Sequence, residues 1–162
     1  MDLKIVQVIV SFCFILICSG LLMSQGFMYW ESNFGPITLA NIATQNGVSE
    51  GESQVKLFTS GDAEISADNT DAARLTGPGD DSLYTEYKLK FDGNGTSKTG
   101  GSTVSFTSYD SFLVTPAYVT HIPDDNDVKV TLSVKASNYT GQLANAGTYT
   151  ATQTLTVHWV GP

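Results

Sequence analysis

The residues with the most reactive side chains do not combine into a known catalytic arrangement. The two histidines, His121 and His158, have no cysteine or carboxylate at the spacing that is typical of metal sites. The chain also lacks the short motifs of serine hydrolases, zinc proteases and phosphate-binding loops. His158 falls on the outward face of an alternating segment, where a solvated surface histidine is expected. We therefore predict no catalytic residue, no metal ligand and no cofactor.

Two acidic clusters are the best candidates for a ligand site. Residues 124–127 read Asp-Asp-Asn-Asp, and residues 68–71 read Asp-Asn-Thr-Asp. Ca²⁺ prefers several oxygen ligands, but neither cluster has the central glycine and terminal glutamate of an EF-hand loop. Asp and Asn also favour turns, because their side chains bond to nearby backbone groups. We interpret both clusters as turns, with calcium binding as the alternative.

The beginning of the chain has the composition of an export segment. Residues Ile5–Ile17 are almost wholly apolar, and small residues follow at Ser19-Gly20 and again at Ser24–Gly26. This pattern is typical of a secretory signal peptide, which we assign to residues 1–26 with cleavage after Gly26 or Gly20. The alternative is an uncleaved anchor helix, because apolar residues continue through Met23 and approach the length that spans a bilayer. Either way, the rest of the chain is expected to be secreted or held at the cell surface.

The remaining composition excludes several classes of protein. Both cysteines, Cys13 and Cys18, lie in the export segment, so the exported part has no disulfide and no reactive thiol. The formal net charge is −8, and the lysines are scattered along the chain. Nucleic-acid binding needs clustered cations, so we expect no nucleic-acid partner. A membrane contact is expected only through an uncleaved N-terminal segment.

The exported part is predicted to form a series of short strands that are separated by turns. Gly, Pro, Asn and Asp clusters separate segments of alternating polar and apolar residues, and no window has a convincing helical period. The expected strands are 37–42, 54–59, 63–67, 82–91, 103–107, 111–114, 127–136 and 148–159. About seven or eight strands without crossover helices predict an all-β protein, an immunoglobulin-like antiparallel β-sandwich. We expect one domain over residues 33–162, preceded by a short arm at 27–32 and by the signal or anchor helix.

The last predicted strand has the strictest alternation in the chain. One face carries apolar side chains at Tyr149, Ala151, Leu155, Val157 and Trp159. The other face carries a ladder of threonines from Thr148 to Thr156, followed by His158. Because side chains on a strand alternate between faces, this segment is expected to be buried on one side and wetted on the other. It therefore closes the core of a two-layer β protein.

This C-terminal segment carries a resemblance to a known group of proteins. The run Ala146-Gly147-Thr148-Tyr149-Thr150, leading into the threonine-rich strand, resembles the end of spore coat U and chaperone–usher fimbrial subunits. Two further segments are similar to parts of those domains, Asn33–Ile37 to an opening strand and Leu83–Leu89 to a central strand. The common cysteine pair of the family is absent from the exported part of this chain.

The resemblance implies a structural subunit without enzymatic activity. In that family an incomplete sandwich accepts an N-terminal strand from a neighbouring subunit, so copies of the chain or related subunits form a polymer by β-strand addition. The expected acceptor residues are Tyr149, Leu155, Val157 and Trp159. The expected donor residues are Phe27, Met28, Tyr29 and Trp30 in the arm, or Ile37 and Leu39 in the first strand. The alternative is a domain that is complete by itself and needs no donor strand. A periplasmic chaperone is a possible further partner.

Two other functions fit the composition. A secreted carbohydrate-binding or adhesin module could stack sugar rings on Tyr109, Phe112, Tyr118 and Tyr139, although strand and loop packing explains the same aromatic residues. A membrane-tethered surface sandwich would follow if the N-terminal segment stays uncleaved.

Overall fold

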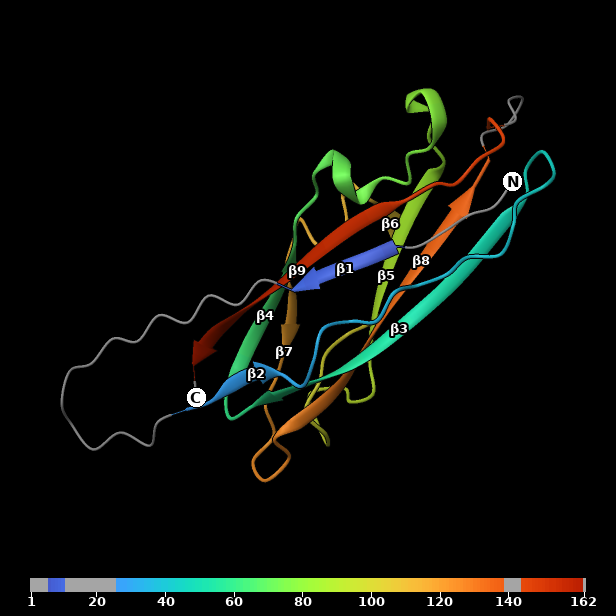
Figure 1. The fold of residues 1–162 in the computed structure, drawn as a ribbon. Coiled ribbons are helices and arrows are strands. Elements are labelled where there is room, and N and C mark those ends of the chain that lie inside the picture. Colours follow the sequence, from blue (N-terminus) through green and yellow to red (C-terminus); the bar gives the residue numbers. More distant parts are fainter. Residues whose placement is uncertain (1–5, 11–25, 139–143, 162) are drawn as a thin grey trace.

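The computed structural model describes residues 6–10, 26–138 and 144–161 (Figure 1). In that part of the chain, strands dominate, and the only helical elements are two single turns of 3-10 helix. In chain order, the elements are β1 (Val6–Val10), β2 (Met28–Trp30), β3 (Val48–Thr59), β4 (Asp62–Ala67), η1 (Asp71–Ala73), η2 (Pro78–Asp80), β5 (Tyr84–Phe91), β6 (Val104–Ser108), β7 (Ala117–Val119), β8 (Asp127–Ser137) and β9 (Ala151–Gly161). The predicted all-β class is confirmed.

The strands form two sheets that face each other across a shared core. One sheet has the order β1-β9-β4-β7, and the other has the order β2-β3-β8-β5-β6. Every strand pair is antiparallel except β1 with β9, which is parallel. Figure 1 shows that the long strands β3, β8 and β9 run along the length of an elongated molecule.

The core lies between the sheets and is built from alternate residues of the strands. On β8 every second side chain is buried, from Val128 through Val130, Leu132 and Val134 to Ala136. On β5 the inward side chains Tyr87 and Leu89 are fully buried. The alternation that predicted these two strands therefore also identifies the face that each presents to the core.

Two predicted strands are wrong, and apolar content explains both errors. Residues 37–42 form no regular strand, although Ile37, Leu39 and Ile42 are buried in the core. Residues 111–114 form a turn in which the backbone nitrogen of Phe112 donates to the carbonyl oxygen of Ser108 at 2.9 Å. In both segments, apolar side chains reach the core from irregular backbone, which a hydrophobic run does not distinguish from a strand.

The N-terminal export segment lies mostly outside the described residues. Within it, Val6–Val10 forms β1, a strand where the sequence predicted part of a helix. None of the helices within the described ranges is long and apolar enough to cross a membrane.

Candidate functional site

Strand β9 separates an apolar face from a threonine face, as its sequence predicted. Tyr149, two residues before the strand, and Leu155 within it are fully buried, and Val157 is nearly so. Thr152, Thr154 and Thr156 are half-buried on the other face, and His158 is exposed. The three buried residues of the predicted acceptor set therefore line the core side of one strand.

The fourth predicted acceptor residue, Trp159, lies at the end of the molecule and is 37% exposed. Its indole ring packs against two glycines, because a Cβ atom added at either Gly26 or Gly61 would lie 2.5 Å from a ring carbon. Gly26 directly precedes the arm at 27–32, so the C-terminal end of β9 lies beside the start of the arm.

The outer edge of β9 is the part of the molecule that can accept another strand. The backbone nitrogen of Asp68 donates to the carbonyl oxygen of Thr154 at 2.9 Å, so the backbone groups of Thr154 face β4. Because successive residues of a strand direct their backbone groups to opposite sides, those of Gln153 and Leu155 face the outer edge.

That outer edge is occupied over only part of its length. Strand β1 pairs with it in parallel register, from Val6 opposite Ala151 to Val10 opposite Leu155. Beyond Leu155, no strand in the described ranges pairs with this edge of β9. The strand in place therefore comes from the segment that the sequence assigns to a signal peptide or anchor.

A partly exposed hydrogen-bond network holds the turn that leads into β9. The Tyr149 hydroxyl lies 2.9 Å from both Asp81 Oδ2 and the carbonyl oxygen of Asn145, and the backbone nitrogen of Asn145 donates to the same carboxylate at 2.5 Å. The hydrogen bonds from Asn145 and Tyr149 lower the pKa of Asp81. Burial, with a smaller contribution from Asp81, raises the pKa of Tyr149 to about 12. The hydrogen bonds that hold the turn from Ala146 to Tyr149 therefore favour the ionised form of Asp81.

The predicted donor residues of the arm lie in the sheet of their own domain. Residues 28–30 form β2, which pairs antiparallel with residues 57–59 of β3. Trp30 is 8% exposed and packs edge-on against Phe34, with ring centroids 5.5 Å apart, and Met28 is half-buried against the core. Phe27 and Tyr29 are exposed, at 40% and 45%. The arm therefore has one face in the core and one face in solvent.

The other two predicted donor residues, Ile37 and Leu39, are also buried in their own domain. They fill the space above Gly51 on the inner face of β3, because a Cβ atom at Gly51 would lie 2.6 Å from Ile37 Cγ2 and 2.9 Å from Leu39 Cδ2. The absence of a side chain at position 51 is what makes room for them.

One residue of the β9 face was missed by sequence reasoning. Gln153 is fully buried on the core side, between Ala151 and Leu155. Its Nε2 atom donates to the carbonyl oxygen of Asp68 at 3.0 Å, whereas its Oε1 atom is buried without a hydrogen-bond partner. The strict alternation of the strand places position 153 on the inner face, so the pattern carried this information although the polar side chain argued against it.

The acidic cluster at 124–127 is engaged with protein groups, whereas in the cluster at 68–71 the Oδ1 atom of Asn69 is buried without a hydrogen-bond partner. Asp125 Oδ2 accepts a hydrogen bond from the backbone nitrogen of Thr99 at 2.6 Å, and Asp127 pairs with Lys56 at 2.8 Å. Asp124 has a φ of 70°, a conformation that Asp tolerates in turns. Among the described residues, no group of three or more His, Cys, Asp or Glu side chains is placed to hold a metal ion.

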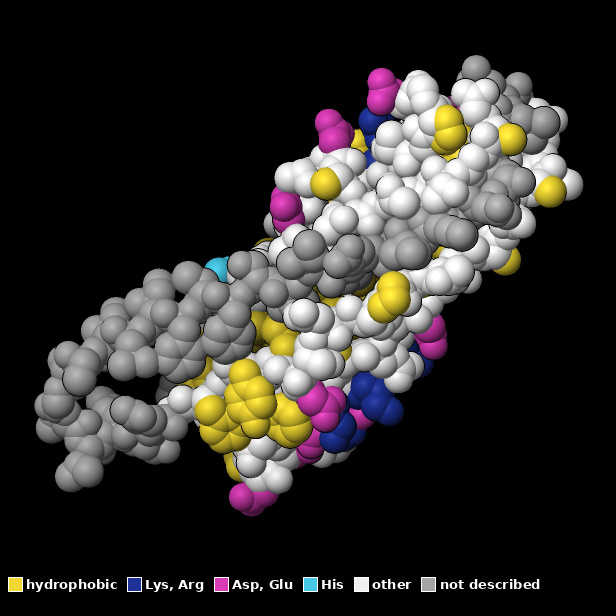
Figure 2. Space-filling view, viewed as in Figure 1, with side chains coloured by type: hydrophobic (Ala, Val, Ile, Leu, Met, Phe, Trp, Pro, Cys, Tyr) yellow, Lys and Arg dark blue, Asp and Glu magenta, His cyan; other side chains and the backbone are white. Residues whose placement is uncertain are grey.

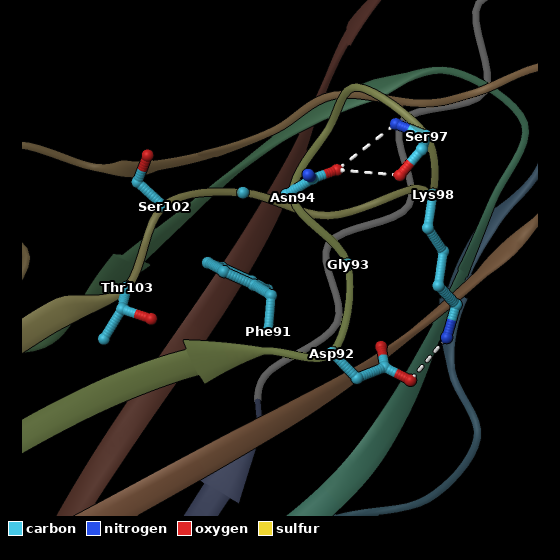
Figure 3. Close-up of a pocket in the computed structure, with 9 residues that line it drawn as sticks. Phe91, Asp92, Gly93, Asn94, Ser97, Lys98, Ser102 and Thr103 are labelled. Carbon is cyan, nitrogen blue, oxygen red and sulfur yellow. Dashed lines mark hydrogen bonds and ion pairs between the residues drawn. The ribbon is translucent and has the colours of Figure 1, made fainter.

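A hollow of about 590 Å³ lies at the loop that follows β5, lined by Phe91, Asp92, Gly93, Asn94, Ser97, Lys98, Gly101, Ser102 and Thr103. Figure 3 shows its polar side chains bonded to one another: Lys98 Nζ lies 2.6 Å from Asp92 Oδ2, and Asn94 Oδ1 accepts from the backbone nitrogen of Ser97. Burial alone would raise the pKa of Asp92, but hydrogen bonds from Lys98 and the backbone nitrogen of Lys129 lower it. These contacts bind the side chains of Asp92, Asn94 and Lys98 to groups of the loop itself.

The aromatic residues suggested for sugar stacking do not form a common surface. Phe112 is fully buried, and its ring centroid lies 5.5 Å from that of Tyr87. Tyr109 is partly buried against the core, and the exposed Tyr118 donates its hydroxyl to Asp62 at 2.6 Å. Tyr139 lies outside the described residues. The burial of Phe112 agrees with the packing interpretation and leaves this ring unavailable for stacking on a sugar.

No protein-family model matches this chain, and no curated protein sequence matches it.

Proposed function

We propose that the protein is a structural subunit of an extracellular fibre, pilus or coat, and that neighbouring subunits join by strand addition at the outer edge of β9. The observation that supports this most is that Val6–Val10 pairs with Ala151–Leu155 of that edge. Removal of a signal peptide after Gly20 or Gly26 would take β1 away. The backbone groups of Gln153 and Leu155 would then need a new partner, since unpaired edge strands readily accept another chain.

The direction of the chain favours a strand from a neighbouring copy, and not a strand from the same chain, as the partner of the β9 edge. Gly26 lies beside Trp159 at the C-terminal end of β9. The described part of the chain before Gly26, β1, pairs with β9 in parallel. The same segment of a neighbour stacked end to end would run antiparallel to β9, and antiparallel pairing is slightly more stable per residue. Such a head-to-tail contact does not close and generates a fibre.

The burial of the predicted donor residues limits which segment of the chain can donate a strand to a neighbour. Trp30, Ile37 and Leu39 would have to leave buried positions in their own domain to enter a neighbour. Cleavage after Gly20 would leave Leu21, Leu22 and Met23 as a further apolar segment before Gly26. We therefore propose that the donor strand comes from the residues that precede Gly26. As a separate proposal, we assign the two-sheet fold to the immunoglobulin-like class of sandwiches.

A competing peptide tests this function. The full-length gene is expressed in a host that exports the product, and assembly of the exported protein is followed by light scattering. A synthetic peptide with the sequence of residues 4–11, which contains β1, is expected to occupy the edge of β9 and to stop growth. A peptide with the same residues in scrambled order is the control. Assembly that proceeds equally with both peptides would argue against the edge of β9 as the acceptor.

A further inference from the structure

The lysines, which are scattered along the sequence, gather on one face of the folded domain. The outer face of the five-stranded sheet carries Lys56 on β3, Lys88 and Lys90 on β5, and Lys129 and Lys135 on β8. Each of them lies between two buried core residues of its own strand, so its side chain points away from the core. Figure 2 shows Lys and Arg side chains, in dark blue, next to acidic ones beside the strand labelled β3 in Figure 1.

Two of these lysines are paired within the sheet. Lys56 Nζ lies 2.8 Å from Asp127 Oδ2, and Lys135 Nζ lies 2.5 Å from Glu86 Oε2. Within the described residues, no carboxylate forms an ion pair with the remaining three, which we call the lysine row: Lys88, Lys90 and Lys129.

Little negative charge of the same sheet is close to the lysine row. Glu52 of β3 lies level with Lys88 but two strands away, about 10 Å, with Ser133 of β8 between them. Asp92, the next outward residue after the end of β5, is paired with Lys98 at 2.6 Å. The row therefore offers its positive charge to a partner outside its own sheet.

The outer face of the other sheet carries the opposite charge. Strands β4, β7 and β9 contain no Lys or Arg, whereas Asp62 and Glu64 point outward from β4, on either side of the buried Ala63. Asp68 continues this alternation just past β4, where its backbone nitrogen donates to the carbonyl oxygen of Thr154 at 2.9 Å. We call Asp62, Glu64 and Asp68 the acidic face. Within the described residues, no Lys or Arg forms an ion pair with these three carboxylates.

Neutral donors hold the Asp62 carboxylate in place. The Tyr118 hydroxyl donates to Oδ2 at 2.6 Å, and the backbone nitrogen of His121 donates to Oδ1 at 2.8 Å. These bonds lower the pKa of Asp62, so its charge persists in mildly acidic solution. Glu64 lies level with Tyr118 on one side and with His158 on the other. The acidic face is therefore a fixed array of carboxylates on a sheet surface.

We propose that copies of this chain also associate side by side, with the lysine row of one copy on the acidic face of the next. The two faces point in opposite directions from the shared core, so a shift along the normal of the sheets brings them together. Both faces repeat their charges at every second residue, about 7 Å along a strand, so the charges match when strands of two copies run alongside each other.

The charge of the whole chain favours a second copy as the partner of the lysine row. The formal net charge is −8, which repels an anionic polymer at long range, whereas another copy presents its carboxylates locally. The contact does not close, so it arranges copies or fibres in layers. It goes beyond the proposed function, since neither face contains the backbone edge of β9.

Charge reversal in the exported protein tests this contact. Lys88→Glu/Lys90→Glu makes both faces acidic, and Glu64→Lys/Asp68→Lys makes both faces basic. Light scattering and electron microscopy follow side-by-side association in about 20 mM NaCl, where screening is weak. Each variant alone is expected to need at least about ten times more protein than the wild type, because like charges meet. An equimolar mixture of the two variants is expected to associate within about threefold of the wild-type concentration, because opposite charges meet again.

Two controls accompany these variants. Lys88→Arg/Lys90→Arg keeps both charges and is expected to change the association concentration less than about threefold. In about 300 mM NaCl, side-by-side association of the wild type is expected to weaken at least about tenfold, which leaves separate filaments. Circular dichroism and thermal unfolding show that each variant folds.

The outcomes separate this contact from the proposed function. Association that is independent of salt and of both charge reversals, or a mixture that stays dispersed, would overturn the contact and leave strand addition intact. A wild type that forms no filaments, yet associates in low salt and loses this association on charge reversal, would overturn the proposed function and support the contact. If the wild type stays dispersed in low salt but binds heparin through the lysine row, an anionic polymer is the partner, which overturns the contact.

Discussion

At the scale of single residues, the turn before β9 depends on one carboxylate. Asp81 accepts hydrogen bonds from the Tyr149 hydroxyl and from the backbone nitrogen of Asn145. These bonds favour the ionised form, so the pKa of Asp81 is lower in the folded protein than in the unfolded chain. The stability that they contribute is complete above the unfolded pKa and is lost as the pH falls through the folded pKa.

Tyr149→Phe tests this network. The variant is expected to lose about 1 kcal/mol of unfolding free energy at neutral pH, because one hydrogen bond to a charged group disappears. The deficit should shrink as the pH falls below 3.8, the ordinary value for Asp81, because protonation weakens the same bond in the wild type. Urea unfolding across this pH range measures it, with the exposed Tyr29→Phe as control. A deficit that is independent of pH would show that Asp81 is not involved.

The arm shows how far sequence can assign single residues. The four neighbouring residues Phe27 to Trp30 all have large apolar or aromatic side chains, so the sequence alone does not distinguish them. All four were therefore predicted as donor residues. The structure places Trp30 in the core and Tyr29 in solvent, because β2 pairs with β3 and its side chains alternate. A strand of three residues is too short to reveal this alternation without its partner.

Substitutions on the two faces of the arm check this placement. Trp30→Ala is expected to lower the unfolding free energy by roughly 3–5 kcal/mol, because it removes a large buried side chain. Tyr29→Ala is expected to cost only about 1 kcal/mol, mainly the stacking on Phe58. Chemical denaturation of both variants compares them. Equal losses would mean that β2 is not docked as the structure shows.

At the scale of elements, the long alternating strands were predictable and the irregular segments were not. Strands β5, β8 and β9 follow their predicted ranges to within three residues at each end, because their alternation extends over eight residues or more. The segment at 37–42 was predicted as a strand, yet its backbone is irregular, and Gly51 provides the room for its side chains. That complementarity involves two segments that are distant in the sequence, so no local pattern contains it.

Gly51→Ala tests the packing of this segment. The added Cβ would lie 2.6 Å from Ile37 Cγ2, so the segment must shift, with an expected loss of roughly 1–3 kcal/mol in unfolding free energy. Gly35→Ala is the control, since its Cβ would meet only Ser53 Oγ at 3.6 Å. Thermal unfolding of both variants measures the difference. If Gly51→Ala is as stable as the control, residues 37–39 are not seated on β3.

At the scale of the whole molecule, stability is expected to come from the apolar core and the backbone ladders. The exported part has no cysteine, and the carboxylates of Asp125 and Asp127 bond to Thr99 and Lys56. Addition of a calcium chelator is therefore expected to leave the melting temperature unchanged. A fall of several degrees on chelation, restored by Ca²⁺, would show that the acidic turns bind metal in the folded protein.

The central claim is that the exported protein polymerises through an edge of β9 that becomes open when its own N-terminal segment is removed. Size-exclusion chromatography and electron microscopy of the exported protein, with its N-terminus determined by mass spectrometry, test this most directly. We predict a chain that begins at Leu21, which keeps Leu21, Leu22 and Met23, and that forms filaments one subunit wide. A chain that begins there but stays monomeric at the highest attainable concentration would contradict the claim.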